Sequence, residues 1–148
     1  MADVTVKRLD EFEAIFGGGF LRVRAGLGVS SFGIAVMDLP PNFSDYPEHD
    51  QAHDNQEEVY GLISGRATLR VGGEGGEEIA LEPGVWVRVG MHEKRKILTG
   101  GEPAQVLAVG GSPGAVYDPP EFTHEGGAIH ALKAELGKGA AELENRLG

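Results

Sequence analysis

The stretch HDQAHDNQEEVYGLISGRATLRV, residues 49–71, contains the pattern that decides the fold. Near its end the apolar residues Ala67, Leu69 and Val71 alternate with polar ones. Successive side chains of a β-strand point to opposite faces, so this alternation predicts a strand with one face in a core and one in water. The pair Ser64-Gly65 just before it is typical of a turn between two strands.

Short apolar segments of this kind recur on both sides of the stretch, at residues 20–25, 32–39, 57–63, 66–71, 77–81, 85–89, 94–98 and 104–109. The 24 glycines and 8 prolines are scattered between these segments, where they favour turns. Eight short strands without an intervening helix are typical of a β-sandwich or barrel. We expect the barrel interior to be lined by Leu69, Val71, Val85, Val87 and Leu107.

The two ends of the chain follow other patterns. Residues 4–9 alternate like a strand, and Asp10 followed by Glu13 favours a short helical turn through Phe16. Residues 128–147 are rich in Ala, Leu, Glu and Lys, which predicts a short helical C-terminal tail split near its glycines. We expect one domain over residues 1–148, with a barrel core at about 20–118 and the tail at about 121–148.

Composition excludes several classes of function. The chain has 23 acidic and 13 basic residues, a formal charge of −10, so nucleic acid and anionic membranes are poor partners. It has no cysteine, which leaves His, Asp and Glu as the strong metal ligands. No stretch approaches the roughly 20 apolar residues of a membrane span, and the N-terminus lacks a signal-peptide pattern, so we expect a cytoplasmic protein.

Residues 49–65 resemble the first motif of the cupin superfamily, in which two histidines and a glutamate precede an apolar strand and a glycine turn. With Gly65 at the motif glycine, Glu58 takes the position of the metal-binding carboxylate and His53 that of the second histidine. Gln51 stands where the first histidine would be. The resemblance implies an all-β fold, the antiparallel double-stranded β-helix or cupin jelly-roll barrel.

The segment LEPGVWVRVGMHEKRKI, residues 81–97, resembles the second cupin motif, with its Pro-Gly turn, apolar strand and distal metal-binding histidine. Counting eleven residues from Gly84 brings that histidine position to Arg95, while His92 lies three residues earlier. The resemblance covers about residues 32–109, in the style of small single-domain bacterial cupins that mostly lack an assigned reaction. Two of the four ligand positions thus depart from the pattern, so fold analogy alone does not establish metal chemistry.

The histidines allow two interpretations. In a straight strand His49 and His53 would stand roughly 13 Å apart, whereas metal–nitrogen bonds are about 2.1 Å long. A metal set of His49, His53 and Glu58 therefore requires a bend between the histidines, which Asp54 and its neighbours allow. The other interpretation is that both histidines are solvated loop residues.

Two functions follow from these alternatives. One is a divalent-metal-dependent enzyme acting on a small oxygenated or carboxylated metabolite. The other is a metal-free binding or sensor protein that recognises a small anion through Arg95, with Gln51 and Tyr60 as further binding residues. A guanidinium stays charged and would repel a metal ion beside it, so either the ion is absent or Arg95 turns away. If Arg95 points inward, it suits a carboxylate or phosphate ligand; if it points outward, it is an ordinary solvated cation.

A purely structural role is a third possibility. The resemblance implies pairing of two barrels through sheet edges, so we expect a homodimer. Alternation in residues 85–89 places Trp86 on the outer face of its strand, where it would be available for such packing.

Overall fold

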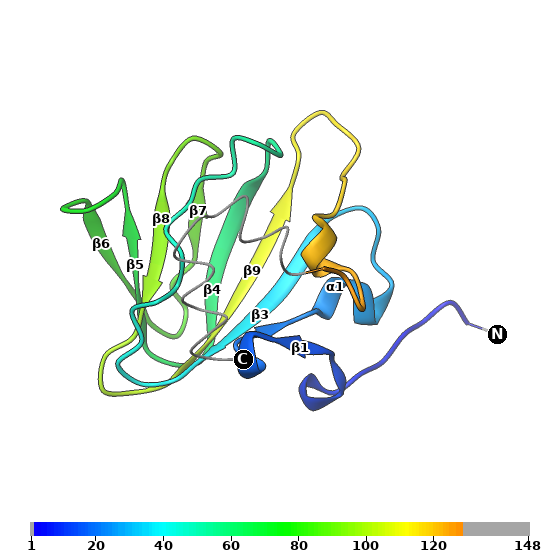
Figure 1. Ribbon diagram of the computed structural model, residues 1–148, viewed down its shortest axis with the longest axis horizontal. Coiled ribbons are helices and arrows are strands. Elements are labelled where there is room, and N and C mark those ends of the chain that lie inside the picture. The colour runs from blue at the N-terminus through cyan, green and yellow to red at the C-terminus, as the bar shows by residue number, and fades with distance from the viewer. Residues whose placement is uncertain (1, 129–148) are drawn as a thin grey trace.

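The computed structural model describes residues 2–128, which form two antiparallel β-sheets that enclose a common core (Figure 1). The larger sheet has the strand order β1 (Ala14–Ile15), β2 (Phe20–Leu21), β3 (Gly33–Leu39), β9 (Ala104–Gly111), β4 (Glu57–Gly65) and β7 (Val87–Val89). The smaller sheet has the order β6 (Glu77–Leu81), β5 (Ala67–Val71) and β8 (Arg95–Leu98). All pairings are antiparallel, so the expected all-β barrel is confirmed.

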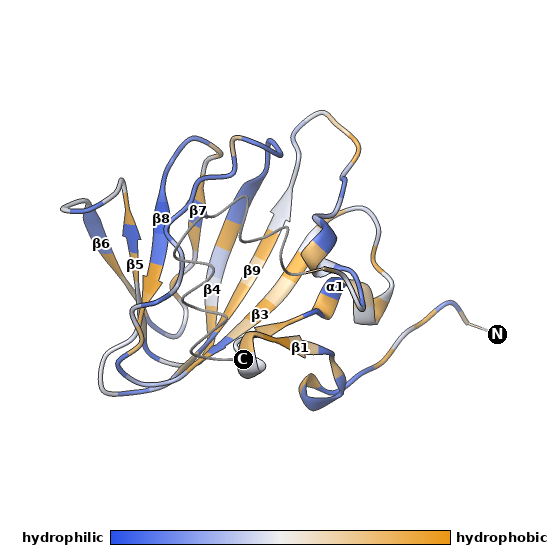
Figure 2. Cartoon of the chain, viewed as in Figure 1, coloured by the Kyte–Doolittle hydropathy of each residue, from blue (hydrophilic) through white to orange (hydrophobic). Residues whose placement is uncertain are grey.

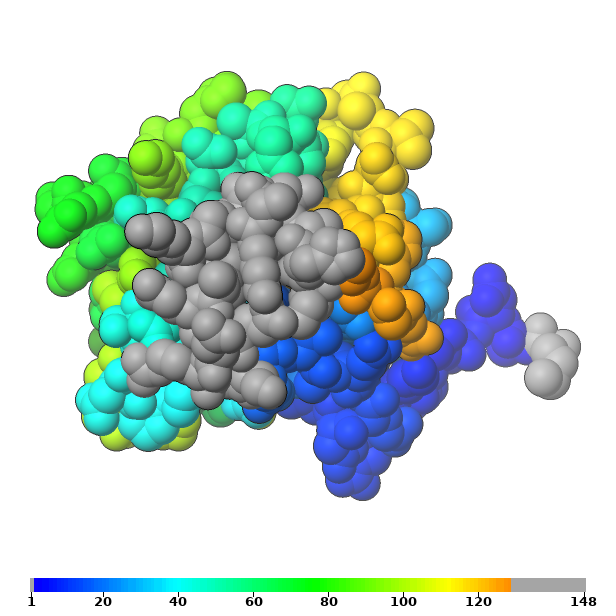
Figure 3. Space-filling model, in the orientation of Figure 1, coloured from blue at the N-terminus to red at the C-terminus, as the bar shows by residue number. Residues whose placement is uncertain are grey.

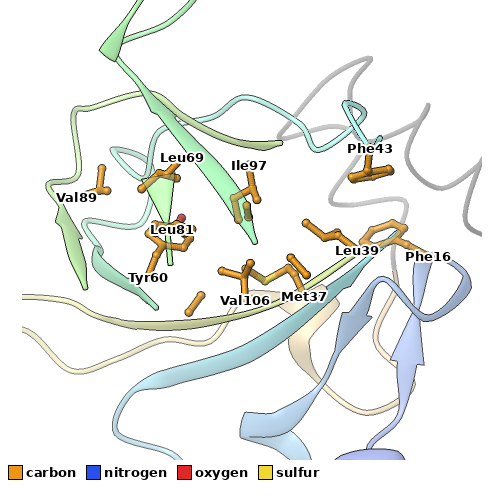
Figure 4. Packing of buried hydrophobic residues seen from close by; sticks show 13 residues of the cluster. Phe16, Met37, Leu39, Phe43, Tyr60, Leu69, Leu81, Val89, Ile97 and Val106 are labelled. Atoms are coloured by element: carbon orange, nitrogen blue, oxygen red, sulfur yellow. The ribbon is translucent and has the colours of Figure 1, made fainter. Parts of the chain in front are cut away.

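Side chains from the inner faces of the two sheets pack against each other. Leu69 and Ile97 of the smaller sheet face Met37 and Val106 of the larger one (Figure 4), and all four are buried. Apolar residues are concentrated along β3 and β9 in Figure 2, where both strands contribute to this core. Burial of each such side chain stabilises the fold by about 1.5–3 kcal/mol.

Two of the expected interior residues do not line the barrel. On β9, Val106 and its alternate neighbours face inward, so Leu107 faces outward and packs against Leu21, Val23 and Val36. The prediction for Leu107 was wrong because both faces of this strand are covered and its sequence is apolar throughout. Val85 lies before β7 and outside the core cluster, whereas Leu69, Val71 and Val87 belong to it or pack against it.

Residues 20–25 do not form one strand. β2 ends at Leu21, and a short helix, α1 (Val23–Leu27), follows it (Figure 1). Gly28 ends the helix with a left-handed backbone (φ +77°), and its amide donates to the Ala25 carbonyl at 3.1 Å. The expectation of a strand series uninterrupted by helix is therefore wrong, because this capping glycine was read as turn punctuation.

The N-terminal region contains 3₁₀ turns in place of the expected helical turn through Phe16. These are η1 (Leu9–Glu11) and η2 (Phe16–Gly18), with β1 between them. Glu13 does not cap a helix here because its carboxylate pairs with Arg22 and accepts a hydrogen bond from the Gly126 amide. Residues 2–8 are extended and exposed but lie outside the sheets, and they project from the body in Figure 3.

A third 3₁₀ turn, η3 (Glu121–Thr123), follows β9 and lies near α1 (Figure 1). Phe122 of this turn contacts Phe20, with the ring centroids 5.3 Å apart. The expected helical tail, residues 128–147, lies outside the described residues except for its first position. None of the helices formed by residues 2–128 has the length and apolar character needed to cross a membrane.

Candidate functional site

A cavity of about 120 Å³ lies between the larger sheet and the loop that leads into β4. This volume is roughly ten times what one water molecule requires. One part of its wall is apolar and largely aromatic or aliphatic: Phe16, Phe20, Met37, Leu39 and Phe122. Another part is polar: His49, Gln51, His53, Gln56 and Glu58. The cavity can thus hold a small molecule with an apolar body and a polar end.

The loop before β4 is fastened to the edge of the smaller sheet. His49 and Arg95 exchange two backbone hydrogen bonds, of 3.1 and 2.8 Å, and form an isolated antiparallel bridge. The Gln51 amide then donates to the Met91 carbonyl at 2.9 Å. These bonds bring the loop residues of the first motif beside the second motif, which lies about forty residues later along the chain.

Glu58 is the carboxylate at the centre of the polar wall. Its Oε1 accepts a hydrogen bond of 2.8 Å from the Tyr60 hydroxyl and lies 3.9 Å from Nε of Arg95. The hydroxyl of Tyr46, which also borders the cavity, lies close enough to Tyr60 and Glu58 to be affected by both. Tyr60 and Arg95 thus both engage Oε1, while Oε2 has no hydrogen-bond partner within residues 2–128.

Burial controls the acid–base properties of this group of residues. Removal of Glu58 from water raises the pKa of its carboxyl, while the Tyr60 hydroxyl and the Arg95 charge lower it and the Asp54 charge raises it further. Burial and the Glu58 charge likewise raise the pKa of Tyr60 well above its ordinary value, so its hydroxyl remains a donor at neutral pH.

Arg95 points inward, as the metal-free hypothesis requires. The residue is 0% exposed, and its Nη2 donates to the carbonyls of Val89 and Gly90 at 3.4 and 3.2 Å. Its Nε and Nη1 have no hydrogen-bond partner within the described residues. Arg95 and Tyr60 contact Glu58 but are not part of the cavity wall, so they lie behind the carboxylate that a bound molecule would meet.

The two histidines of the first motif have different surroundings. His49 Nδ1 lies 2.9 Å from the Pro47 carbonyl, which can only accept, so the ring carries its proton on Nδ1. Burial lowers the pKa of His49 to about 4, and the nearby charge of Arg95 acts in the same direction. His53 is 43% exposed at its side chain, with Nε2 at 3.6 Å from Oδ2 of Asp54.

The side chains of residues 2–128 do not fit a divalent metal ion. Within residues 2–128 there is no cluster of three His, Asp or Glu side chains with the geometry of a metal site, so the expected set of His49, His53 and Glu58 is not assembled. The loop bends, but His49 is held by Pro47 and its bridge to Arg95. A buried guanidinium beside Glu58 already supplies the positive charge that a metal would bring.

Sequence patterns did not identify several residues around the cavity, chiefly Arg22, Arg24, Tyr46, Gln56 and Tyr117. The two arginines alternate with Leu21 and Val23, and such alternation usually marks the water-facing side of a strand. Here both are buried beneath the segment after β9, whose Phe122 and Thr123 carbonyls accept hydrogen bonds from them. The sequence signal for their burial was the presence of two arginines within an otherwise apolar segment, residues 20–25.

Comparison with known proteins supports the fold and leaves the reaction open. No protein-family model matches the sequence, and no curated protein matches it either. Among solved structures, the chain is similar to a cupin protein from Bacteroides fragilis, with a TM-score of 0.61, 20% identity and coverage of 81% of this chain and 93% of that one. It is also similar to a sugar phosphate isomerase of the cupin superfamily from Silicibacter pomeroyi.

For the Silicibacter protein the TM-score is 0.59 at 20% identity, with coverage of 78% of this chain and 77% of that one. Both similarities extend over most of each chain. Together with the antiparallel topology and the placement of the two motifs side by side, they show that this chain has the fold of the cupin superfamily.

Proposed function

We propose that this chain is a metal-free binding protein whose barrel cavity holds a small oxygenated molecule. The observation that carries the proposal is the pairing of Glu58 with a fully buried Arg95 at the position where the cupin resemblance implies a histidine ligand. The pair gives the cavity a carboxylate of fixed orientation, with its countercharge supplied by the chain itself. A metal-dependent enzyme is disfavoured because it would need a third protein ligand and the removal of that guanidinium.

Glu58 defines what a bound molecule must present. Its Oε1 is engaged by Tyr60 and Arg95, so a ligand approaches through Oε2, which accepts hydrogen bonds. The matching group is a donor such as a hydroxyl or an amine. Gln51 contributes an amide group to the same part of the cavity wall, and His49 contributes an unprotonated Nε2. The phenylalanines opposite favour an apolar remainder.

The proposal is tested by metal content and metal titration. We expect protein purified without chelator or affinity metal to contain far less than one metal ion per subunit by elemental analysis. Calorimetric titration with Mn²⁺, Fe²⁺, Ni²⁺ and Zn²⁺ should show no stoichiometric binding. One tightly bound ion per subunit would overturn the proposal and restore the metal-dependent hypothesis.

A double variant serves as the positive control for this measurement. Gln51→His combined with Arg95→His supplies the two histidines that the resemblance implies, while His53 and Glu58 remain. Because four nitrogen and oxygen ligands suffice for Zn²⁺ or Ni²⁺, this variant should bind one ion per subunit in the same titration. If the unmutated protein binds an ion as tightly as the double variant, Arg95 does not exclude metal and the proposal is wrong.

A further inference from the structure

Three arginines are buried in and around the cavity: Arg22, Arg24 and Arg95. A buried guanidinium cannot lose its proton, so its charge must be compensated by a carboxylate or by several good hydrogen bonds. Arg22 forms an ion pair with Glu13 and donates to the carbonyls of Phe122 and Gly127 at 2.8 and 2.9 Å. Arg95 has Glu58.

Among residues 2–128, Arg24 has no carboxylate partner of this kind. Its Nη1 donates to the Val29 carbonyl at 2.9 Å, and its Nη2 makes a long contact of 3.4 Å to the Thr123 carbonyl. Nε is buried without a hydrogen-bond partner, and no carboxylate of the described residues forms an ion pair with this side chain. Arg24 is 8% exposed and lines the cavity, unlike Arg95, so a bound molecule reaches it first.

Tyr117 lines the cavity together with Arg24. Burial raises the pKa of Tyr117 to about 12, against the opposing effect of the Arg24 charge, so the phenol stays protonated at neutral pH. Within the described residues its hydroxyl has no hydrogen-bond acceptor. The nearby carboxylate of Asp54 accepts a hydrogen bond of 2.6 Å from Gln56 Nε2 at Oδ2, and its Oδ1 is buried without a hydrogen-bond partner among the described residues.

From this arrangement we infer that the cavity ligand carries a carboxylate, which pairs with Arg24 and accepts a hydrogen bond from Tyr117. The inference rests on the proposed function and specifies its ligand class. Because the Glu58 charge repels a carboxylate, the acid group of the ligand lies against Arg24, while a hydroxyl or amino group of the ligand donates to Oε2 of Glu58. The ligand is therefore a small acid with an apolar body and a separate donor group.

Calorimetric titration at neutral pH with hexanoate and hexanamide tests the inference, since the two probes share their shape and differ in charge. We expect hexanoate to bind at least about tenfold more tightly, the effect of one charge-assisted hydrogen-bonded contact. Arg24→Gln should remove this preference, Arg24→Lys should retain part of it, and Tyr117→Phe should weaken hexanoate alone.

Arg70→Gln is the matched control. Arg70 lies on β5 of the smaller sheet and also has a buried Nε without a hydrogen-bond partner among the described residues, but it pairs with Glu48 and does not line the cavity. Circular dichroism and melting curves establish whether each variant is folded. If Arg24→Gln does not fold, the comparison is made with Arg24→Lys.

The possible outcomes separate the two proposals. Equal binding of the two probes, or a hexanoate preference that survives in folded Arg24→Gln, overturns the carboxylate inference and leaves cavity binding intact. Failure of every probe to bind the unmutated protein overturns both. A preference lost equally in Arg70→Gln would show a general charge effect and also overturns the inference.

Discussion

Arg95 and Glu58 are two charges removed from water together. Desolvation of each costs several kcal/mol, and their attraction offsets this only with good geometry and further hydrogen bonds. Tyr60 and the carbonyls of Val89 and Gly90 supply such bonds. The pair therefore adds little to stability by itself, and its role is to hold one carboxylate in a fixed position at the cavity wall.

His49 should make stability depend on pH. Its pKa is about 4 in the folded protein and 6.5 when unperturbed, so the unfolded chain takes up a proton first as the pH falls. Stability is then lost between these values, by about 3 kcal/mol at most at roughly 1.4 kcal/mol per unit of pKa. Arg95 and His53 reinforce the effect, and the Pro47 carbonyl and Asp50 oppose it.

The measurement is the melting temperature at about pH 7 and about pH 5, across the titration range of an ordinary histidine. His49→Gln should lose less stability on acidification than the unmutated protein, because glutamine does not titrate. His92→Gln is the control, since His92 is exposed in the turn before β8. The same acid sensitivity in His49→Gln and the unmutated protein would contradict the prediction.

At the level of single residues the sequence predicted part of the site. Glu58, Gln51 and His53 were found because motif spacing survives in the chain, and His49 because it is a histidine close to them, and the structure places all four on the cavity wall. The roles of Tyr60 and Arg95 were not predictable, because spacing does not reveal which side chain stands in front of another. Arg24 was missed because its burial depends on a segment about a hundred residues later.

Among the elements, the end of β4 is the most constrained by backbone geometry. Gly65 has φ +77°, a left-handed conformation, and a Cβ there would overlap the carbonyl oxygen of Pro103. Gly65→Ala should therefore destabilise the protein by about 2 kcal/mol or more, through backbone strain and displacement of the start of β9. Chemical denaturation measures this difference.

Gly101→Ala is the matched control for this substitution. Gly101 lies in the turn just before β9, has no positive φ, and has no neighbouring atom within 4 Å of the place that an added methyl group would take. The change there should alter the unfolding free energy by no more than about 0.5 kcal/mol. Similar losses in the two variants would show that the turn before β9, rather than the conformation of Gly65, determines the cost.

Strands with clear alternation or glycine boundaries were predicted nearly to the residue, as β5 and β6 illustrate. The bounds of the short elements were not predicted with this accuracy. Residues 20–25 divide into β2 and α1 because Gly28 caps a helix and because Phe12 packs where a side chain on Gly26 would lie. Contacts of this kind join segments that are distant in the sequence, so the local pattern of apolar residues does not predict them.

On the scale of the whole molecule, one outer face of the larger sheet is apolar. Val59, Ile63 and Trp86 are 36%, 49% and 62% exposed, and Trp86 lies over Gly61 of β4. At the rim, Arg88 pairs with Glu57 at 2.9 Å. A patch with both charges at its rim is complementary to itself, as a two-fold interface requires, so we propose that a second copy of the chain covers it.

Light scattering at micromolar concentration should then give the mass of a dimer, and Trp86→Asp should convert it to a monomer by placing a charge in the interface. Val116→Asp should leave the dimer intact, because Val116 is also exposed but lies in the loop after β9. A monomeric mass for the unmutated protein, or equal effects of the two substitutions, would argue against this interface.

The guanidinium behind Glu58 has a consequence for the conditions under which the cavity remains intact. A metal ion is in exchange with its surroundings: it can be withdrawn by chelators, replaced by a competing ion or, if redox-active, oxidised. Arg95 is covalently part of the chain and keeps its charge at every physiological pH. The cavity should therefore be complete as soon as the chain has folded, whether its surroundings are starved of metal or rich in it.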